Sequence, residues 1–365
     1  MAPSGENEDG ICHSNHTFSF GATDLEFGAA PWPENKDAFL MSTFDSKLQE
    51  AWDKAKVDGA FWYDVSNVER KTIVGSFGLQ AQLNTKRFSQ RRKPDESTQV
   101  VMPFNEAKFN FTKIKENEIL FTMKDMDTNN SGESHKVIIN VSPIEYGHIL
   151  LVPNIDMKLP QVLDKEAVKL AAQVCLLSKH RGFCMGFNSL CALASVNHQH
   201  LHALYINYQL PIDKVILQPR EGGLLILENY IVRGYAIQLE KNVEFFANQV
   251  SLVTNHLCLN NVAHNLFIRR ERCASEEAIT SNNGSALTAF IFPKLPSAGI
   301  KGTLHLNSNC FDLAGYLLFK DQEEYDGITE HKAVEILNQY TYREDEFDRL
   351  TDELTYLLKR MVPTA

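Results

Sequence analysis

Three histidines separated by single residues, His198, His200 and His202, constrain this chain more than any other feature of its sequence. Val196, Leu201 and other apolar residues that favour extended structure surround them, so the pattern predicts a strand. Successive side chains of a strand point to opposite faces, and three residues at this spacing therefore share one face. Near neutral pH, each uncharged imidazole can act as a nucleophile, a base or a metal ligand.

Strands are expected in both halves of the chain with helices between them, which is the pattern of an α+β protein. One amphipathic helix is expected from Asp45 or Ser46, as the cap, to about residue 57, and another over residues 164–179. Strands before the histidines are expected at residues 109–114, 119–123, 137–141, 149–152 and 183–187.

A chain of 365 residues can bury a substantial core, as one large domain or two smaller ones. Residues 1–40 carry Gly, Pro, Asn and Glu with little periodicity, and we expect them to form a flexible or loosely docked arm. Residues 41–210 form the half that holds the histidines. Residues 211–365 form a second half with similar elements but without the motif.

Composition excludes several classes of protein. No run of about 18 apolar residues is present, and the polar N-terminus does not resemble a secretory signal. Seven cysteines, an odd number without CxxC spacing, suit free thiols in a reducing cytoplasm. The net charge of −10 argues against nucleic acid and anionic membranes as partners. An anionic small substrate would need a local basic pocket.

Two basic positions are candidates for such a pocket. The segment QLNTKRFSQRRKP, residues 82–94, is either a solvated basic loop or a source of arginines, such as Arg87, that clamp phosphate. Lys113 is a candidate phosphate contact, with an ordinary surface charge as the alternative.

Three uses of the histidines compete. Buried structural imidazoles would each need a hydrogen-bond partner in an otherwise apolar strand. A metal site is the second use, but no carboxylate or cysteine follows at ligand spacing, and His198 and His202 would lie about 13 Å apart in a strand. The third is nucleophilic catalysis at phosphorus, in which His200 attacks a phosphoryl group while its neighbours orient it and stabilise charge.

Small polar residues around the motif favour the third use. Asn188, Ser189 and Ser195 are hydrogen-bond donors that suit an anionic centre. His148 opens the strand predicted at residues 149–152, which could place it beside the other histidines.

Several ordered motifs resemble a known family. HQHLHAL and YGHILLVP resemble the histidine-triad superfamily of nucleotide hydrolases and transferases. Between about residues 75 and 340, the chain is similar to the GDP-D-glucose phosphorylases, which are related to the GDP-L-galactose phosphorylases of plants; the segments that carry this resemblance are QLN, KFNFTKI, VSPIEYGHILLVP, GFNSL, ASVNHQHLH, AHNLF and DLAGY. The resemblance implies a histidine-triad-like fold, an antiparallel sheet with packed helices, in two similar halves.

The resemblance also implies a role for each histidine. His200 would be the nucleophile that takes up GMP from a GDP-hexose, such as GDP-glucose, and releases hexose 1-phosphate; inorganic phosphate would then release GDP. His198 would hold the tautomer of His200. His202 would hydrogen-bond the phosphoryl oxygens or protonate the leaving group, and His148 matches the fourth histidine of triad proteins.

In the same way, Asn188 and Ser195 would bind the α-phosphate, and neither a metal nor a cofactor would be needed. Two positions depart from the related families. His202 stands where the hexose-1-phosphate uridylyltransferases and plant phosphorylases usually have glutamine, and DLAGY, residues 312–316, is given no catalytic role. Phosphate or water therefore both stay open as the acceptor, and the alternatives are a hydrolase that releases GMP or a nucleotide-binding regulator. A homodimer is a further expectation.

Overall fold

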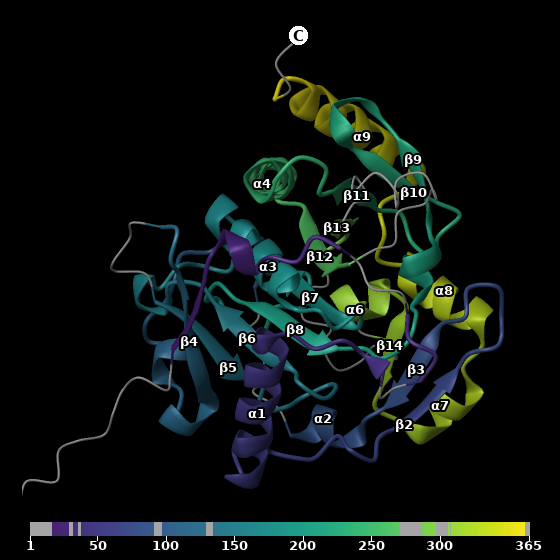
Figure 1. Cartoon of the computed structure of the whole chain (residues 1–365). Helices are drawn as coiled ribbons and strands as arrows, with labels where there is room; N and C mark the ends of the chain where they lie inside the picture. Colours follow the sequence, from purple (N-terminus) through teal and green to yellow (C-terminus); the bar gives the residue numbers. More distant parts are fainter. Residues whose placement is uncertain are drawn as a thin grey trace, which may run out of the picture.

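The structure, a computed structural model, describes residues 17–28, 32–35, 38–90, 97–128, 134–270, 287–296, 306 and 308–361. Its centre is an 11-stranded sheet with the order β1-β4-β5-β6-β8-β7-β12-β13-β11-β10-β9 (Figure 1). The strands are β1 Thr17–Phe20, β4 Ile119–Asp125, β5 His135–Ile139, β6 Ile149–Val152, β7 Phe183–Asn188, β8 Leu201–Tyr205, β9 Ile216–Pro219, β10 Leu225–Glu228, β11 Tyr235–Gln238, β12 Ala263–Arg269 and β13 Thr288–Lys294. Neighbouring strands are antiparallel except for the parallel pair β1–β4.

A smaller sheet joins segments that are far apart in the sequence. It contains β2 Glu69–Thr72, β3 Gln80–Leu83 and β14 Tyr316–Phe319, in the order β14-β3-β2. Strand β14 runs parallel to β3, whereas β2 is antiparallel to it. The small sheet therefore links a segment before the histidines to one near the C-terminus.

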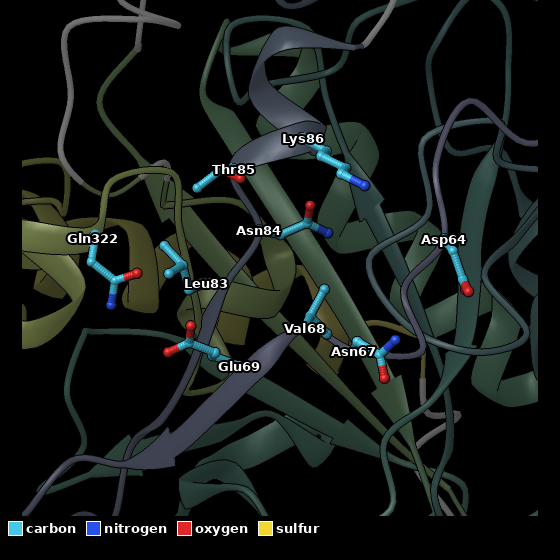
Figure 2. Close-up of a pocket in the computed structure, with 9 residues that line it drawn as sticks. All are labelled: Asp64, Asn67, Val68, Glu69, Leu83, Asn84, Thr85, Lys86 and Gln322. Carbon is cyan, nitrogen blue, oxygen red and sulfur yellow. The ribbon is translucent and has the colours of Figure 1, made fainter.

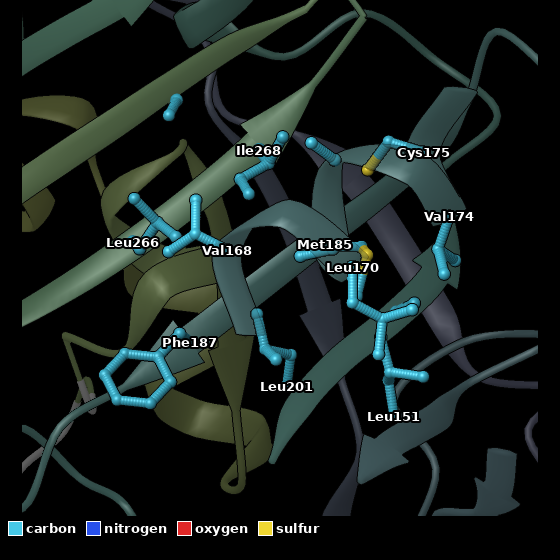
Figure 3. Close-up of a cluster of buried hydrophobic side chains, with 14 of the residues drawn as sticks. Leu151, Val168, Leu170, Val174, Cys175, Met185, Phe187, Leu201, Leu266 and Ile268 are labelled. Carbon is cyan, nitrogen blue, oxygen red and sulfur yellow. The ribbon is translucent and has the colours of Figure 1, made fainter. Parts of the chain in front are cut away.

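Helices α3 and α4 pack against one face of the large sheet. The helices of the described residues are α1 Thr43–Val57, α2 Thr85–Ser89, α3 Lys165–Leu177, α4 Val243–Leu259, α6 Cys310–Leu313, α7 Gln322–Gly327, α8 Glu330–Asn338 and α9 Glu344–Lys359. Figure 3 shows Val168 and Leu170 of α3 in the same cluster as Phe187 and Leu201 of the sheet. Burying one such aliphatic side chain contributes about 1.5–3 kcal/mol, so this layer holds β7 and β8 in place. None of these described helices has the length and apolar character needed to cross a bilayer.

The opposite face of the sheet carries His202. Along β8, Leu201 and Ala203 belong to the core beneath α3, whereas Leu204 belongs to the core beneath the small sheet. Because side chains alternate along a strand, His202 lies on the second face. There its ring centroid is 6.3 Å from that of Phe311 on α6.

The predicted α+β class is confirmed, and most predicted elements are present. The predicted strand at residues 149–152 is β6, and the predicted helix at residues 164–179 is α3, capped by Asp164. The first helix begins earlier than predicted. Its cap is Ser42, whose hydroxyl accepts the N–H of Asp45, while the carboxylate of Asp45 accepts the N–H of Ser42. Asp45 is therefore the third residue of a capping box rather than the cap.

The predicted strand at residues 109–114 is wrong. A short 3-10 turn occupies residues Phe111–Lys113, because the Asn110 side chain accepts the Thr112 N–H at 3.1 Å. Such local bonds compete with a strand ladder. In the segment expected to be an arm, Thr17–Phe20 forms strand β1, and residues 1–16 lie outside the described residues.

Candidate active site

Of the three histidines in the motif, only His202 lies on a strand. His198 and His200 lie in the irregular segment before β8. The Gln199 N–H donates to the Leu159 carbonyl, and the His200 N–H donates to the side-chain oxygen of Gln161, both at 2.9 Å. Residues from a loop thus take the bonds that a neighbouring strand would take. The prediction of one strand through all three histidines is therefore wrong. The ring centroids of His200 and His202 are nevertheless only 5.3 Å apart.

The tautomer of His200 follows from its backbone contact. Its Nδ1 lies 2.7 Å from the carbonyl oxygen of His198. A carbonyl oxygen can only accept, so Nδ1 carries a proton, and in the neutral ring Nε2 carries the lone pair. The side-chain nitrogen of Gln161 also donates to the carbonyls of His200 and Asn188, both at 3.1 Å. Our sequence reasoning missed Gln161, because a buried glutamine that bonds to backbone leaves no pattern in a sequence.

The turn that delivers His148 depends on a glycine. Gly147 has a φ of 70°, in the left-handed region, and a Cβ there would lie 2.5 Å from the Tyr205 ring. Any other residue would be strained and would displace Tyr205. His148 follows directly and is completely buried.

His148 determines the tautomer of His202. The Ile144 N–H donates to Nδ1 of His148 at 2.9 Å. Burial, together with the charge of Arg87, holds the pKa of His148 well below its ordinary value, so the ring is neutral and its proton is on Nε2. That nitrogen lies 3.0 Å from Nδ1 of His202, which can accept its proton, and 3.2 Å from the amide nitrogen of Asn140, which cannot. Neutral His202 accepts at Nδ1 and therefore carries its own proton on Nε2.

His198 contributes its carbonyl rather than its ring to the contact with His200. Its Nδ1 accepts the Phe111 N–H at 3.1 Å, and its ring packs against the rings of Phe111 and Phe104. Burial lowers the pKa of His198 to about 4, although the Ile155 carbonyl opposes this shift. The imidazole is therefore a neutral part of the wall, and its acceptor position is fixed.

Asn188 ends β7 beside the histidines. Its Oδ1 accepts from the Asn265 side chain at 2.6 Å and from the Cys310 N–H at 3.0 Å. Two donors on the oxygen fix the amide so that its Nδ2 points away from them. Asn265 and Cys310 both come from the second half of the chain, and sequence reasoning missed them.

The loop between β7 and the histidines is held in an unusual conformation. The Ser189 hydroxyl accepts the His264 N–H at 3.0 Å and donates to the Leu190 carbonyl at 2.9 Å, so it serves the backbone. Leu193 has a φ of 80°, which costs a non-glycine residue about 1–3 kcal/mol. Half-buried Ser195 lies in this loop, three residues before His198.

Arg87 and Lys113 differ in their surroundings. Arg87, on α2, donates to the Ser142 carbonyl and lies close enough to His148 to influence its pKa. Lys113 is exposed and donates to the carbonyls of residues 106–108. Arg91, Arg92 and Lys93 of the same basic segment as Arg87 lie outside the described residues.

A pocket of about 310 Å³ opens beside the small sheet (Figure 2). Mainly polar side chains line it: Asp64, Asn67, Val68, Glu69, Leu83, Asn84, Thr85, Lys86 and Gln322. None of the four histidines lines this pocket, but Asn84 accepts the N–H of Arg87 at 3.1 Å and so borders both regions. In the part of the chain that the structure describes, no three His, Cys, Asp or Glu side chains are arranged to hold a metal ion.

Comparison with known families identifies the origin of this site. The model of the GDPGP1-like N-terminal domain matches residues 43–204, and that of the GDPGP1-like C-terminal domain matches residues 208–360. The chain belongs to the GDPGP1-like family. His148, His198, His200 and His202 of this GDPGP1-like chain all lie within the first match.

Curated relatives cover most of the chain. "GDP-D-glucose phosphorylase 1" of Xenopus laevis is 31% identical over 384 aligned residues, covering 94% of this chain and 96% of that protein. The protein of the same name from Danio rerio is 36% identical, with 86% and 91% covered. "GDP-L-galactose phosphorylase 2" of Arabidopsis thaliana is 32% identical, with 84% and 74% covered.

A solved structure supports the fold. The yeast Ap4A phosphorylase Apa2 in complex with Ap4A is 18% identical and has a TM-score of 0.57, with 82% of this chain and 98% of that chain covered. At that identity the likeness concerns the fold alone. It confirms the expected histidine-triad-like α+β architecture of the GDPGP1-like chain.

Proposed function

We propose that this GDPGP1-like chain is a GDP-D-glucose phosphorylase, a nucleotidyltransferase that converts GDP-glucose and inorganic phosphate into GDP and glucose 1-phosphate. Relatives with that name align over most of the chain. The observation that carries the mechanism is the bond between Nδ1 of His200 and the His198 carbonyl. It places a lone pair on Nε2, and a neutral imidazole nitrogen is a suitable nucleophile for phosphorus.

In the first step, Nε2 of His200 attacks the α-phosphorus of GDP-glucose. A P–N bond forms, the bond from the α-phosphorus to the bridging oxygen breaks, and glucose 1-phosphate leaves with that oxygen. His202, which carries its proton on Nε2, would donate a hydrogen bond to a phosphoryl oxygen or to the leaving oxygen.

In the second step, an oxygen of inorganic phosphate attacks the guanylyl group on His200. The P–N bond breaks, GDP leaves, and His200 returns to its neutral state. Because the second step reverses the direction of charge movement in the first, the same neighbouring donors serve both steps. The chain would need no metal or cofactor.

Six residues are proposed to assist the phosphoryl groups. The Asn188 side-chain oxygen already accepts two hydrogen bonds, and we propose that its amide nitrogen donates to the substrate. Ser195 would donate from the loop before the histidines. Ser189 would maintain the shape of that loop and His148 would orient His202. Arg87 and Lys113 would supply positive charge; substituting each with Met and measuring the KM for phosphate tests them separately.

Mass spectrometry provides the direct test of the mechanism. Incubation with GDP-glucose in the absence of phosphate should add one GMP to the protein, on a peptide that contains His200. Addition of phosphate should remove the adduct and yield GDP. An active enzyme that shows no adduct in rapidly quenched samples would rule out the covalent mechanism.

The acceptor and the substrate are tested by products. GDP that appears only with phosphate supports a phosphorylase, whereas accumulation of GMP at the same rate with or without phosphate would identify a hydrolase. GDP-glucose, GDP-L-galactose, UDP-glucose and ADP-glucose should be compared under the same conditions. We expect GDP-glucose to have the highest kcat/KM.

We also propose a cytoplasmic location and a homodimer. The five cysteines among the described residues are free thiols, which suits a reducing compartment. Fluorescence microscopy of a tagged chain tests the location. Light scattering of the purified protein tests the homodimer, since one chain has a mass of 41.3 kDa.

A further inference from the structure

We propose that Glu145 is a positioning residue for the phosphorylase reaction, because its carboxylate holds the turn that sets the tautomers of His148 and His202. The inference rests on the proposed function for the chemical consequence of those tautomers. The hydrogen bonds themselves do not depend on it.

The Glu145 carboxylate is buried and accepts hydrogen bonds from three side chains. Nε and Nη2 of Arg70 each lie 2.7 Å from one of its two oxygens, which is the bidentate arrangement. The Gln82 amide donates to Oε1 at 3.0 Å, and the Tyr316 hydroxyl donates to the same oxygen. The carboxylate is therefore fully engaged.

The three partners come from the three strands of the small sheet. Arg70 lies on β2, Gln82 on β3 and Tyr316 on β14, and Arg70 is directly opposite Gln82 in the register of β2 and β3. Because β2 and β3 precede the histidines and β14 lies near the C-terminus, both halves of the chain converge on one carboxylate. The convergence ties the small sheet to the turn between β5 and β6.

The same turn determines the proton position on His148. The backbone N–H of His148 donates to the Glu145 carbonyl at 3.2 Å, and the Gln82 side chain also donates to the Ile144 carbonyl at 2.9 Å. The Tyr63 hydroxyl donates to the Pro143 carbonyl at 2.7 Å. Tyr63 thus holds the peptide between Pro143 and Ile144, whose N–H makes Nδ1 of His148 an acceptor, and Gln82, bonded to Glu145, holds the peptide that follows it. If the first of these peptides rotates, Nδ1 of His148 can take the proton, and His202 no longer receives one.

A purely structural role is the competing explanation. Buried ion pairs are weak evidence for function or for stability. The pair formed by Asp213 and Arg269 offers a matched control, because both side chains are buried and Nη1 of Arg269 lies 3.1 Å from the Asp213 carboxylate. Arg269 lies at the end of β12 away from Asn265, and its other bonds go to the Ile206 and Tyr208 carbonyls.

The experiment compares Glu145→Gln with Asp213→Asn in the full-length protein. Nitrogen-15 shifts of the histidine rings in ligand-free protein report each tautomer, and a His148→Gln variant assigns the His148 signals. We expect Glu145→Gln to mix the two tautomers of His148 and to lower kcat about 10- to 100-fold, the loss typical when a reactive group is misplaced. Asp213→Asn should lower the Tm without changing either readout.

The inference is overturned if Glu145→Gln keeps the native ring shifts and a kcat within twofold of wild type, even when its Tm falls. If Glu145→Gln does not fold, Tyr316→Phe removes one donor to the carboxylate, together with the hydroxyl that accepts from Gln82. It should give the same changes at about a third of the size or more, and unchanged shifts and kcat in that variant overturn the inference equally. A wild-type protein without phosphorylase activity would refute the proposed function, while the ring shifts would still show whether Glu145 sets the tautomer.

Discussion

His200 and His202 are two residues apart, and their surroundings give them opposite tautomers. Nδ1 of His200 meets a carbonyl oxygen, which can only accept, whereas Nδ1 of His202 meets the protonated nitrogen of His148. The first ring therefore presents a lone pair on Nε2 and the second presents an N–H. Two identical side chains thus present an acceptor and a donor because of their partners alone, which is the difference that the proposed mechanism uses.

The two rings are also held by different means. His202 lies on β8, where its backbone is paired with Leu150 of β6 and Gly186 of β7. His200 lies outside the strand, and Gln161 binds its N–H and its carbonyl. His202, the proposed donor, is thus positioned by the sheet, and His200, the proposed nucleophile, by one side chain. Substitutions that affect only one of these supports should separate the two roles.

The largest effect is expected from His200→Ala. Removal of the nucleophile should lower kcat by about 10⁴-fold or more and should abolish the GMP adduct, since the remaining groups cannot form a P–N bond. Mass spectrometry and steady-state kinetics provide the measurements. Full activity in a folded His200→Ala protein would disprove the proposed role of His200 as the nucleophile.

His264→Gln provides the matched control for His200→Ala. Nδ1 of His264 lies 3.0 Å from the Val262 carbonyl two residues earlier, which repeats the local geometry of His200. The ring of His264 stacks on Phe187, however, on the face covered by α3. The kcat is expected to stay within about threefold of wild type, because a side chain that does not contact the reacting atoms does not alter the activation free energy.

A smaller loss is expected from His148→Phe, which removes the proton donated to His202 while keeping a ring in the cavity. His202 can then carry its proton on either nitrogen. In serine proteases, loss of the group that sets a histidine tautomer costs about 10⁴-fold, and a loss of about 10²–10³-fold is expected here because His202 is not the nucleophile. The GMP adduct should still form, only more slowly. A rate of adduct formation equal to that of wild type would contradict a catalytic effect of His148 through the tautomer of His202.

The sequence predicted the two histidines that are compared, but not the groups that bind them. The HxHxH spacing singled out the residues that we propose to be reactive, and the apolar runs and helical periodicity located β6, β7 and α3. The bend at His198 was not predictable, because it arises from Leu159 and Gln161, about 40 residues earlier in the chain. Contacts of this kind depend on tertiary packing and leave no local periodicity.

Gln161→Met should have a moderate effect that is confined to the nucleophile. Methionine fills a similar volume but neither donates to the carbonyls of Asn188 and His200 nor accepts the His200 N–H. A misplacement below 1 Å is expected to lower kcat by about tenfold with little change in KM. Ring shifts of His202 should stay native in this variant, whereas His148→Phe changes them. A change in both rings would show that the two supports are coupled.

The smallest effect concerns pH and stability, because the opposite tautomers persist only while the supporting rings stay neutral. Burial lowers the folded-state pKa of His198 and His264 to about 4 and that of His148 well below its ordinary value, whereas unfolded histidine has a pKa of about 6.5. Between those values the unfolded chain binds protons that the folded chain does not. Stability should therefore be complete above pH 6.5 and fall as the pH drops toward 4, with a limiting slope of about 1.4 kcal/mol per pH unit for each histidine.

Urea unfolding at pH 7.5 and pH 5.5 measures this slope in a range where most carboxylates remain ionised. Buried Asp312, whose pKa is raised to about 7, adds a slope of opposite sign that wild type and variant share. His264→Gln removes one buried imidazole without touching the reacting groups. As the pH falls, the free energy of unfolding of this variant should therefore decrease less steeply than that of wild type, by the contribution of one histidine. His198, His148 and His180, whose pKa burial also lowers to about 4, contribute to the remaining slope in that variant. An identical pH dependence in wild type and His264→Gln would mean that such a buried ring becomes protonated in the folded state. A protonated His148 could no longer accept the Ile144 N–H that keeps His202 different from His200.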